Sequence, residues 1–219
     1  MVASEVVYSC LAVIIGYLLG SIPSAYIITR LVAGKDIRQL GGGNVGGLNV
    51  YREVGIWPAL TAGIFDFCKG TAAVAIAYWL LAVPTLFVLL AGIAAVIGHN
   101  WMVFLKFSGG KGAGTTVGAL SLIMPLYGYW PGLLIFFGII VIPLIITHNV
   151  ALSIGIALIF LPLVVWLGTH SGVGTIMAAI LGLIMLIKFL PTARRALARS
   201  KTTRDLIFDR QGSGKKKRA

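Results

Sequence analysis

Long runs of apolar residues follow one another along most of the chain, separated by breaks of only a few residues. A membrane-spanning helix needs about 20 consecutive apolar residues, and most of the runs come close to that length. The breaks carry Gly, Pro, Asn or His, which are typical of turns between helices. The pattern therefore predicts an all-α, polytopic membrane bundle of about seven transmembrane helices. The runs cover residues 6–29, 57–80, 85–105, 117–130, 132–148, 150–167 and 173–190.

The basic residues between the runs predict the orientation of the bundle. The loops near residues 81–85, 129–131 and 168–172 contain no Lys or Arg, whereas the intervening loops do. With seven helices and the N-terminus outside, every basic loop and the C-terminus fall on the cytoplasmic side, as the positive-inside rule requires. The fourth run is short and ends in aromatic residues, so a tilted or incompletely spanning fourth helix is the alternative. The basic loop residues are Arg30, Lys35, Arg38, Arg52, Lys106 and Lys111.

Composition agrees with a membrane protein. Of the 219 residues, 58% are hydrophobic and 11% are charged, whereas a soluble domain carries about a quarter charged residues. Seven helices of ~20 residues would use most of the chain, which leaves no room for a separate soluble domain. Cys10 and Cys68 lie in apolar runs, where a thiol behaves as a small hydrophobic group. No basic segment precedes the first run, and no A-x-A cleavage site occurs before Arg30, so we expect a retained helix.

The formal net charge of +12 is concentrated near the C-terminus. Residues 192–219 hold ten Lys and Arg against two Asp, a difference of +8. We therefore expect a membrane domain over residues 1–191 and a basic cytoplasmic tail over residues 192–219. Such a tail is attracted to anionic lipid headgroups, and a disordered topology anchor is the alternative. Nucleic acid is not an expected partner, because only Phe208 offers a stacking ring there.

The first polar loop concentrates glycine, asparagine and arginine. It contains G-x-G-x-x-G, yet no strand precedes it and no βαβ unit fits, so a dinucleotide site is not expected. Consecutive glycines let backbone N–H groups converge on an anion, while asparagine amides and an arginine add donors for phosphate. A flexible turn between helices is the alternative. The loop reads Gly41-Gly42-Gly43-Asn44-Val45-Gly46-Gly47-Leu48-Asn49-Val50-Tyr51-Arg52.

The second polar loop runs from Gly98-His99 to Thr115 and contains Gly109-Gly110-Lys111-Gly112. It is not a Walker A loop, because glycine and not Ser or Thr follows Lys111. The Lys111 ammonium and the amides of a helix that begins near Thr115 could still hold one phosphate. A lysine that snorkels between helices is the alternative. His99 alone is typical of a structural histidine and becomes a candidate because it shares the loop with Lys111.

Two anion-binding loops at one membrane face suggest a ligand with a phosphate at one end and an acyl chain at the other. This combination indicates lipid synthesis. Asp66 and Lys69, three residues apart in the second run, favour a structural ion pair over a functional one. The histidines His99, His148 and His170 are scattered, so no metal site is expected. The sequence also offers no evident Ser-His-Asp set.

At these loops the chain resembles the seven-helix bacterial acyl-phosphate:glycerol-3-phosphate acyltransferases, which make lysophosphatidic acid. The resemblance covers about residues 16–155, and its motifs keep the family's order and helix spacing. This agreement is more specific than any single glycine loop. The motifs are Gly20-Ser21-Ile22-Pro23, Asp36-Ile37-Arg38 followed by the loop from Gly41 to Arg52, Asp66-Phe67-Cys68-Lys69-Gly70, and Gly98-His99 through Thr115.

The resemblance implies a multi-pass protein of the bacterial plasma membrane with a cytoplasmic active site. Its substrates would be glycerol 3-phosphate and an acyl phosphate, membrane phospholipid would surround it, and no cofactor or metal would be needed. By the same resemblance Lys111, His99 and Asn44 would be catalytic. The substrate and phosphate ligands would be Gly41, Gly42, Gly43, Asn49, Arg52, Gly109, Gly110, Gly112, Thr115 and Ser21.

The chain departs from the family pattern at several polar positions. In the first loop Gly42 stands where the family usually has serine, and Leu48 stands where it has threonine. Residues 187–192 lack the basic-His-Arg-x-Asn segment that the family carries near the C-terminus. These departures motivate one alternative, a non-catalytic or re-purposed relative that binds a phospholipid or an acylated anion. A small transporter built on proline-broken helices is a further alternative.

Overall fold

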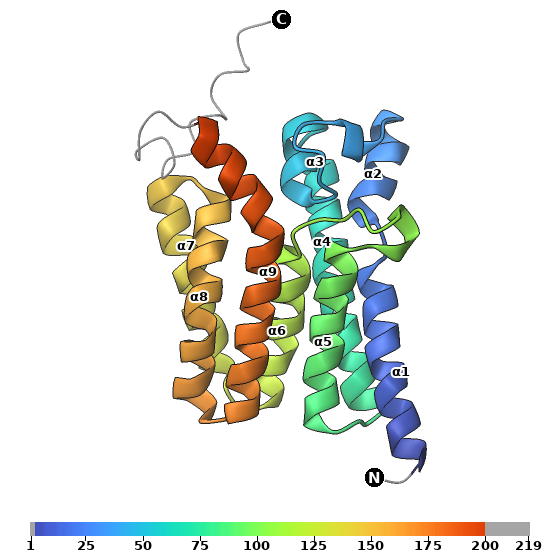
Figure 1. Cartoon of the computed structure of the whole chain (residues 1–219), viewed down its shortest axis with the longest axis vertical. Coiled ribbons are helices and arrows are strands. Elements are labelled where there is room, and N and C mark those ends of the chain that lie inside the picture. Colours follow the sequence, from blue (N-terminus) through green and yellow to red (C-terminus); the bar gives the residue numbers. More distant parts are fainter. Residues whose placement is uncertain (1–2, 200–219) are drawn as a thin grey trace, which may run out of the picture. The chain divides into compact units, whose positions relative to one another are not determined.

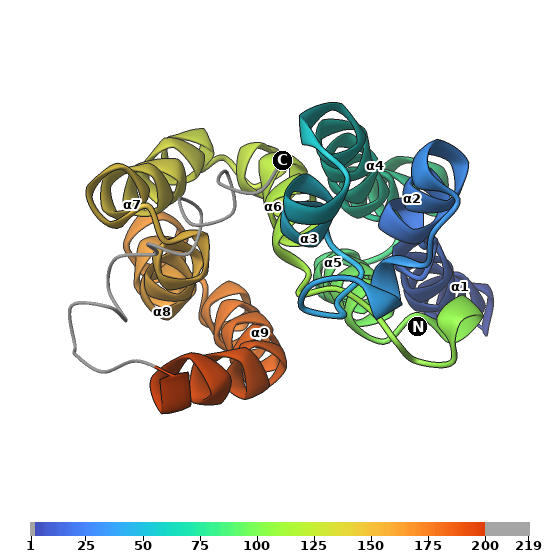
Figure 2. The same ribbon diagram turned by 90° about the horizontal axis from the view of Figure 1, so that it is seen from above.

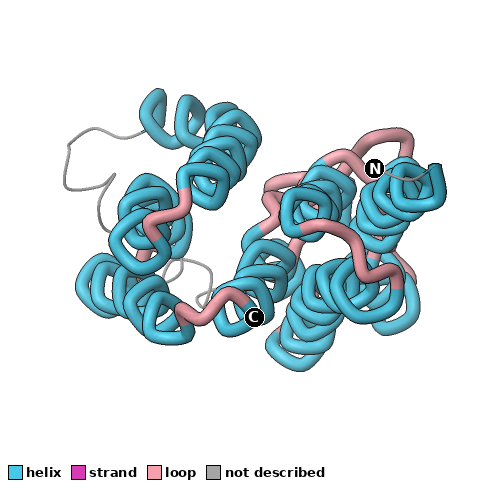
Figure 3. Tube along the Cα trace, turned by 90° about the horizontal axis from the view of Figure 1, so that it is seen from below, coloured by secondary structure: helices cyan, strands magenta, loops and turns pink. Residues whose placement is uncertain are grey.

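The computed structural model describes residues 3–199, and within this range the chain forms helices joined by loops, with no strand (Figure 3). The chain divides into two compact units, and the boundary in the sequence falls between residues 129 and 130. The all-helical fold expected from the apolar runs is thereby confirmed.

The first unit contains the helices that carry both glycine loops (Figure 1). Its long helices are α1, α4, α5 and α6, and its short ones are α2, α3 and the 3₁₀ helices η1 and η3, with a π-helical turn η2 that continues α4. The bounds are α1 (Ala3–Gly20), α2 (Ser24–Ala33), η1 (Ile37–Gln39), α3 (Gly47–Glu53), α4 (Ile56–Ala75), η2 (Ile76–Leu80), α5 (Thr85–Asn100), η3 (Val103–Leu105) and α6 (Ala113–Leu126).

Glycines bring the backbones of the first unit close together. A Cβ on Gly20 of α1 would collide with the Ala95 carbonyl of α5, and a Cβ on Gly118 of α6 would collide with the Phe67 carbonyl of α4. Helices in lipid associate largely by such close contacts, because burying apolar surface gains little when the surroundings are also apolar. Among the helices long and apolar enough to cross a membrane, the one that contains α5 is the most enclosed, with 61% of its most apolar stretch buried. It therefore forms the centre of this unit.

The first apolar run is not one helix, contrary to the prediction for residues 6–29. α1 ends at Gly20 and α2 begins at Ser24, with Ser21, Ile22 and Pro23 between them. Pro23 has no N–H to continue the helical hydrogen bonds, and it also restricts the residue before it, so the chain reorients there. The break turns α2 toward the polar loops and leaves the Ile22 carbonyl available to a side chain of α4.

An apolar cluster lies beneath the polar loops and joins the short elements to α4. Each of its members is at most 9% exposed. Short helices of three to seven residues are not stable alone, so this packing holds them in place. Figure 2 shows α2 and α3 above the ends of the longer helices of this unit. The cluster consists of Ala25, Ile37, Val45, Val50, Ala59, Ala62, Met102 and Leu105.

The second unit consists of α7 (Trp130–Thr147), α8 (Val150–Thr169) and α9 (Gly172–Arg199). α8 packs against both neighbours. Asn149 caps α8 because its Oδ1 accepts a hydrogen bond from Leu152 N at 3.1 Å. α9 continues through the expected boundary at residue 191, so residues 192–199 extend the last helix. The rest of the expected tail, residues 200–219, lies outside the described residues.

Within residues 3–199, six helical segments are long and apolar enough to cross a membrane. α6 is a shorter apolar helix of 14 residues, which agrees with the short fourth run in the sequence. It begins at Ala113, four residues earlier than the expected run, and α5 ends at Asn100 instead of residue 105. Both shifts bring polar motif residues onto helix ends, where orphan backbone groups remain.

Candidate functional site

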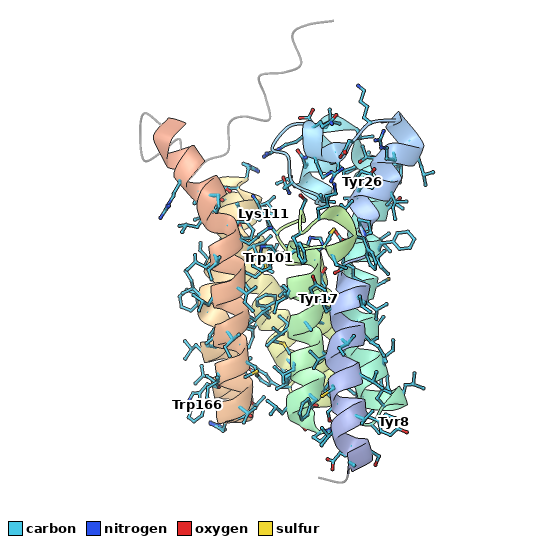
Figure 4. The ribbon with its side chains drawn as sticks, turned by 45° about the vertical axis from the view of Figure 1, so that its right-hand side comes forward. Tyr8, Tyr17, Tyr26, Trp101, Lys111 and Trp166 are labelled. Carbon is cyan, nitrogen blue, oxygen red and sulfur yellow. The ribbon has the colours of Figure 1, made fainter. Side chains whose placement is uncertain are left out.

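The two glycine loops meet in space, as their chemistry suggested. Val45 N donates a hydrogen bond to Gly109 O at 3.3 Å, which joins the first loop to the second. A Cβ on Gly110 would stand 2.6 Å from Val45 O, so the loops touch at a position that only glycine fits. Figure 4 shows Tyr26, Trp101 and Lys111 towards one end of α1–α6 and Tyr8 towards the other. The candidate site therefore lies at the end of this unit away from Tyr8.

Asn49 determines the shape of the first loop. This buried residue of α3 donates through Nδ2 to the carbonyls of Leu40 and Asn44, at 3.1 and 3.0 Å, and lies 3.3 Å from that of Ile37. Its Oδ1 accepts from Gly42 N at 3.1 Å. The amide predicted to bind phosphate is thus engaged by the loop backbone. In this structure Asn49 supports the loop from inside.

The outer surface of the first loop carries three glycines, Asn44 and Arg52. Gly41, Gly42 and Gly43 are exposed, and positive φ angles of 53° at Gly41 and 72° at Gly43 produce the tight turn. Asn44 is half-buried and lies over the loop, because a Cβ on Gly42 would stand 3.3 Å from Asn44 Oδ1. Arg52 is exposed on α3, one helical turn after Asn49.

Glu53 was not anticipated as part of this loop. A Cβ on Gly41 would stand 2.7 Å from Glu53 Oε1, so a carboxylate lies beside the first glycine. Its position follows from α3, whose last residue it is. Because the sequence gives no sign that α3 is helical, the closeness of Glu53 to the glycines could not be predicted.

The second loop ends in the N-terminus of α6. Gly112 is the N-cap, with φ at 75°, and its carbonyl accepts from Thr116 N at 2.8 Å. The first N–H groups of a helix have no partner within it and carry a partial positive charge, so this end favours an anion. Lys111, which is half-buried, immediately precedes the cap. Thr115 is fully buried, and its hydroxyl has no hydrogen-bond partner among the described residues.

Gly109 and Gly110 press against the end of α5. Gly110 N donates to His99 O at 3.0 Å, and a Cβ on Gly109 would stand 2.5 Å from the Asn100 carbonyl. A Cβ on Gly110 would also collide with His99 Nε2. The Gly110 amide is therefore engaged, and both glycines are needed for close approach. His99 is buried behind the loop and does not project from it.

Ser21 lies at the base of the site, in the break between α1 and α2. It is fully buried, and its hydroxyl donates to Gly98 O at 3.4 Å. A Cβ on Gly98 would stand 2.9 Å from Ser21 N, so this glycine permits the contact. Ser21 thus joins α1 to the end of α5 in this structure.

A buried polar cluster lies below the second loop. Asp66 and Lys69 form the ion pair expected from their spacing, with Lys69 Nζ 2.9 Å from Asp66 Oδ1. The same oxygen accepts from Ser24 Oγ at 2.5 Å and lies 3.4 Å from His99 Nδ1. Ser24 was not singled out from the sequence, although its position after Pro23 at a helix start was a usable signal. The arrangement is no nucleophilic triad, because the serine donates to the carboxylate and not to the imidazole.

A second ion pair lies at the edge of the first loop. Arg38 Nη2 is 2.7 Å from Asp36 Oδ2, and the arginine also lies over the Tyr26 ring, 5.3 Å from its centroid. The hydrogen bonds from Arg38 lower the pKa of Asp36. Asp36 also caps η1 by accepting from Arg38 N. This pair fixes the chain between α2 and the glycines.

No group of His, Cys, Asp and Glu that could hold a metal ion occurs among residues 3–199. His148 and His170 lie in turns of the second unit, with φ of 54° and 48°. Residues 187–192, which lack the family's C-terminal motif, belong to α9 in that unit.

Comparison with known proteins gives a consistent result. A family described as glycerol-3-phosphate acyltransferase matches residues 10–199. Glycerol-3-phosphate acyltransferase 1 of Dehalococcoides mccartyi is 48% identical over 91% of this chain and 96% of its own. A glycerol-3-phosphate acyltransferase of a Thermoanaerobacter species is 39% identical over 75% of this chain and 72% of its own.

Solved structures agree with these relatives. The crystal structure of PlsY (YgiH), an integral membrane glycerol 3-phosphate acyltransferase, in its glycerol 3-phosphate form is similar, with a TM-score of 0.78 and 29% identity. The match covers 87% of this chain and 92% of that one. The lysophosphatidic acid form of the same enzyme matches with a TM-score of 0.76 and 27% identity.

Proposed function

Because the chain belongs to the glycerol-3-phosphate acyltransferase family, we propose that it acylates the primary hydroxyl of glycerol 3-phosphate with an acyl phosphate as donor. The hydroxyl oxygen attacks the acyl carbonyl carbon, and the bond between that carbon and the phosphate oxygen breaks. The products are lysophosphatidic acid and inorganic phosphate, and the hydroxyl proton leaves on a substrate phosphate oxygen.

The observation that carries the proposal is the contact between two glycine loops, each flanked by a basic residue. Both substrates carry a phosphate, so the reaction requires two anion sites close together. Val45 and Gly109 join the loops, while Arg52 follows one and Lys111 lies in the other. Preorganised donors around developing negative charge are commonly the largest contribution to catalysis of acyl transfer.

The second loop is the better match to one phosphate. Lys111 supplies an ammonium next to the N-terminus of α6, where the first helical N–H groups point outward. Gly112 lets the chain turn into the helix at this position, and Thr115 lies buried within the first turn of the helix. Gly109 and Gly110 keep this segment close to α5, because a Cβ at either position would collide with the end of that helix.

The first loop accommodates the other phosphate on its exposed side. Gly41, Gly42 and Gly43 present backbone there, Asn44 lies over them, and Arg52 provides a fork suited to phosphate oxygens. Asn49 and Ser21 hold the loop and the helix break that support this arrangement, and we assign them no direct contact with substrate.

An acyl phosphate is already activated, so positioning and charge stabilisation suffice for its transfer. The reaction needs only the side chains and amides of this chain and the phosphates of the substrates. The loops lie in a unit of apolar helices long enough to span a bilayer, which supports a donor whose acyl chain stays in the bilayer while its phosphate reaches the loops. The positive charge of these loops supports a site on the cytoplasmic side of a bacterial plasma membrane.

The decisive experiment follows transfer from palmitoyl phosphate to labelled glycerol 3-phosphate by the purified protein. We expect lysophosphatidic acid and inorganic phosphate in equal amounts. Lys111→Ala removes the charge beside α6 and is expected to lower kcat/KM by about 10²–10³-fold, the usual cost of losing one stabilising donor. The product is measured by its label and phosphate by its release.

Lys35→Ala provides the matched control, because Lys35 is an exposed lysine near the first loop that takes no part in the proposed site. Its activity should equal that of the unsubstituted protein. Transfer from an acyl thioester but not from palmitoyl phosphate would overturn the proposal that an acyl phosphate is the donor. Binding of glycerol 3-phosphate without any transfer would support a non-catalytic relative instead.

A further inference from the structure

Four polar side chains from three helices of the first unit meet in a buried cluster. Ser24 of α2 is 5% exposed, Asp66 and Lys69 of α4 are 4% and 6% exposed, and His99 of α5 is 2% exposed. Burying a carboxylate and an ammonium is costly even when they are paired. An ion pair alone would not require a histidine and a serine from two further helices. The composition of the cluster therefore suggests a role beyond charge pairing.

One carboxylate oxygen organises the cluster. Asp66 Oδ1 accepts from Ser24 Oγ at 2.5 Å, pairs with Lys69 Nζ at 2.9 Å and lies 3.4 Å from His99 Nδ1. Lys69 also donates to Ile22 O at 3.2 Å, in the break between α1 and α2. The lysine neutralises the carboxylate, so the imidazole need not be charged to compensate it.

The other side of the imidazole faces the second loop. Its Nε2 lies against Gly110, where a Cβ would collide with it, and the backbone carbonyl of His99 accepts from Gly110 N. Lys111 is the next residue along the chain. A Cβ on Gly114, in the first turn of α6, would stand 3.1 Å from the Asp66 Cβ. The cluster therefore supports both sides of the segment that carries Lys111.

We infer that Asp66 is a positioning residue: it keeps the proton of His99 on Nδ1, orients the ring so that Nε2 supports Gly110, and thereby sets the place of Lys111. This inference rests on the proposed function, which gives Lys111 its role at a phosphate. The partner of one ring nitrogen determines which nitrogen carries the proton. Lys69 keeps this arrangement neutral, and Ser24 fixes the carboxylate from α2.

A charge-balanced pair of substitutions separates positioning from simple charge pairing. Asp66→Asn alone leaves Lys69 buried without its counter-ion, which is expected to impair folding. Asp66→Asn combined with Lys69→Met removes both charges together. If the pair were only structural, this double variant would fold and transfer acyl groups normally. We expect it to fold with kcat/KM reduced by about 10²-fold, the scale expected when a catalytic group is misplaced by ~1 Å.

Nitrogen NMR of the imidazole supplies a readout that does not depend on activity. In the unsubstituted protein, ¹⁵N-labelled histidine should show His99 as the neutral tautomer with its proton on Nδ1. The signal is assigned by its loss in His99→Gln, and His148 and His170 serve as internal references. In the double variant the Nδ1–H population should fall.

Ser9→Ala is the matched control, because Ser9 is a fully buried hydroxyl of α1 outside this cluster. It should change neither the His99 signal nor the transfer rate. A His99 that is Nε2-protonated or doubly protonated in the unsubstituted protein would overturn the inference, whether or not any variant folds. A double variant with the activity of the unsubstituted protein would also overturn it. Absence of transfer by the unsubstituted protein would refute the proposed function and leave the NMR result to decide this inference.

Discussion

At the scale of single residues, the two asparagines of the first loop have different roles despite similar surroundings in the sequence. Asn49 is buried, and its side-chain amide lies within hydrogen-bond distance of four backbone groups between Ile37 and Asn44. Asn44 is half-buried and lies over the glycines. Both were predicted to contact substrate. Their different roles could not be read from the sequence, because the partners of an amide depend on how the chain folds around it.

The difference predicts separate consequences for the two alanine variants. Asn49→Ala removes the side-chain hydrogen bonds that hold the loop backbone, at a cost of about 0.5–1.5 kcal/mol for each bond. We expect a lower Tm in detergent and, through the deformed loop, a lower transfer rate. Asn44→Ala should lower kcat/KM with Tm unchanged. Thermal unfolding and the transfer assay on the same preparations test this, and a reversed pattern would exchange the roles assigned to the two residues.

At the scale of elements, the long helices were predictable and the short ones were not. The apolar runs for α4, α7 and α8 agree with the observed bounds to within a few residues, because length and hydropathy determine a membrane helix. α3 was missed because its glycine-rich start and mixed composition give no helical period. It forms through packing of Val50 in the apolar cluster beneath the loops. Tertiary contacts thus decide the elements that shape the site.

The candidate site was predictable in its chemistry and only partly in its geometry. Glycine, lysine and arginine in two loops were sufficient to suggest two anion sites. The sequence could not show that Ser21 and His99 are buried and support the site from behind. Their burial depends on the break at Pro23 and on the closeness of α5 to the second loop. Residues with the same chemistry therefore act at the surface of the site or behind it according to helix packing.

Close packing of α4 on α6 predicts unequal effects of two glycine substitutions in one helix. A Cβ on Gly70 would stand 2.9 Å from Ala119 N and collide with the Thr115 carbonyl. Gly70→Ala should force the helices apart, at a cost of about 1–3 kcal/mol, and displace the start of α6. Gly63→Ala, seven residues earlier with open space around it, is the control and should leave Tm and transfer near their original values. Equal Tm for both variants would contradict close α4–α6 packing.

At the scale of the whole molecule, the orientation in the membrane depends on α6. This helix has 14 residues, which at 1.5 Å per residue gives about 21 Å, less than the ~30 Å of a bilayer core. If α6 completes a crossing, the seven-helix order places the start of α9 outside and its end inside. If it does not, the start of α9 lies inside, and the basic residues that follow it lie outside, against the positive-inside rule.

Single cysteines test in intact cells whether α6 crosses the membrane. In a background with Cys10→Ala and Cys68→Ala, Gly172→Cys places a thiol at the exposed start of α9, where nothing lies within 4 Å of the new Cβ. Lys35→Cys places one in the first basic loop. A membrane-impermeant maleimide should label Gly172→Cys directly and Lys35→Cys only after permeabilisation. Protection of both thiols until permeabilisation would mean that α6 does not cross, because the two positions share a side only when the number of crossings between them is even.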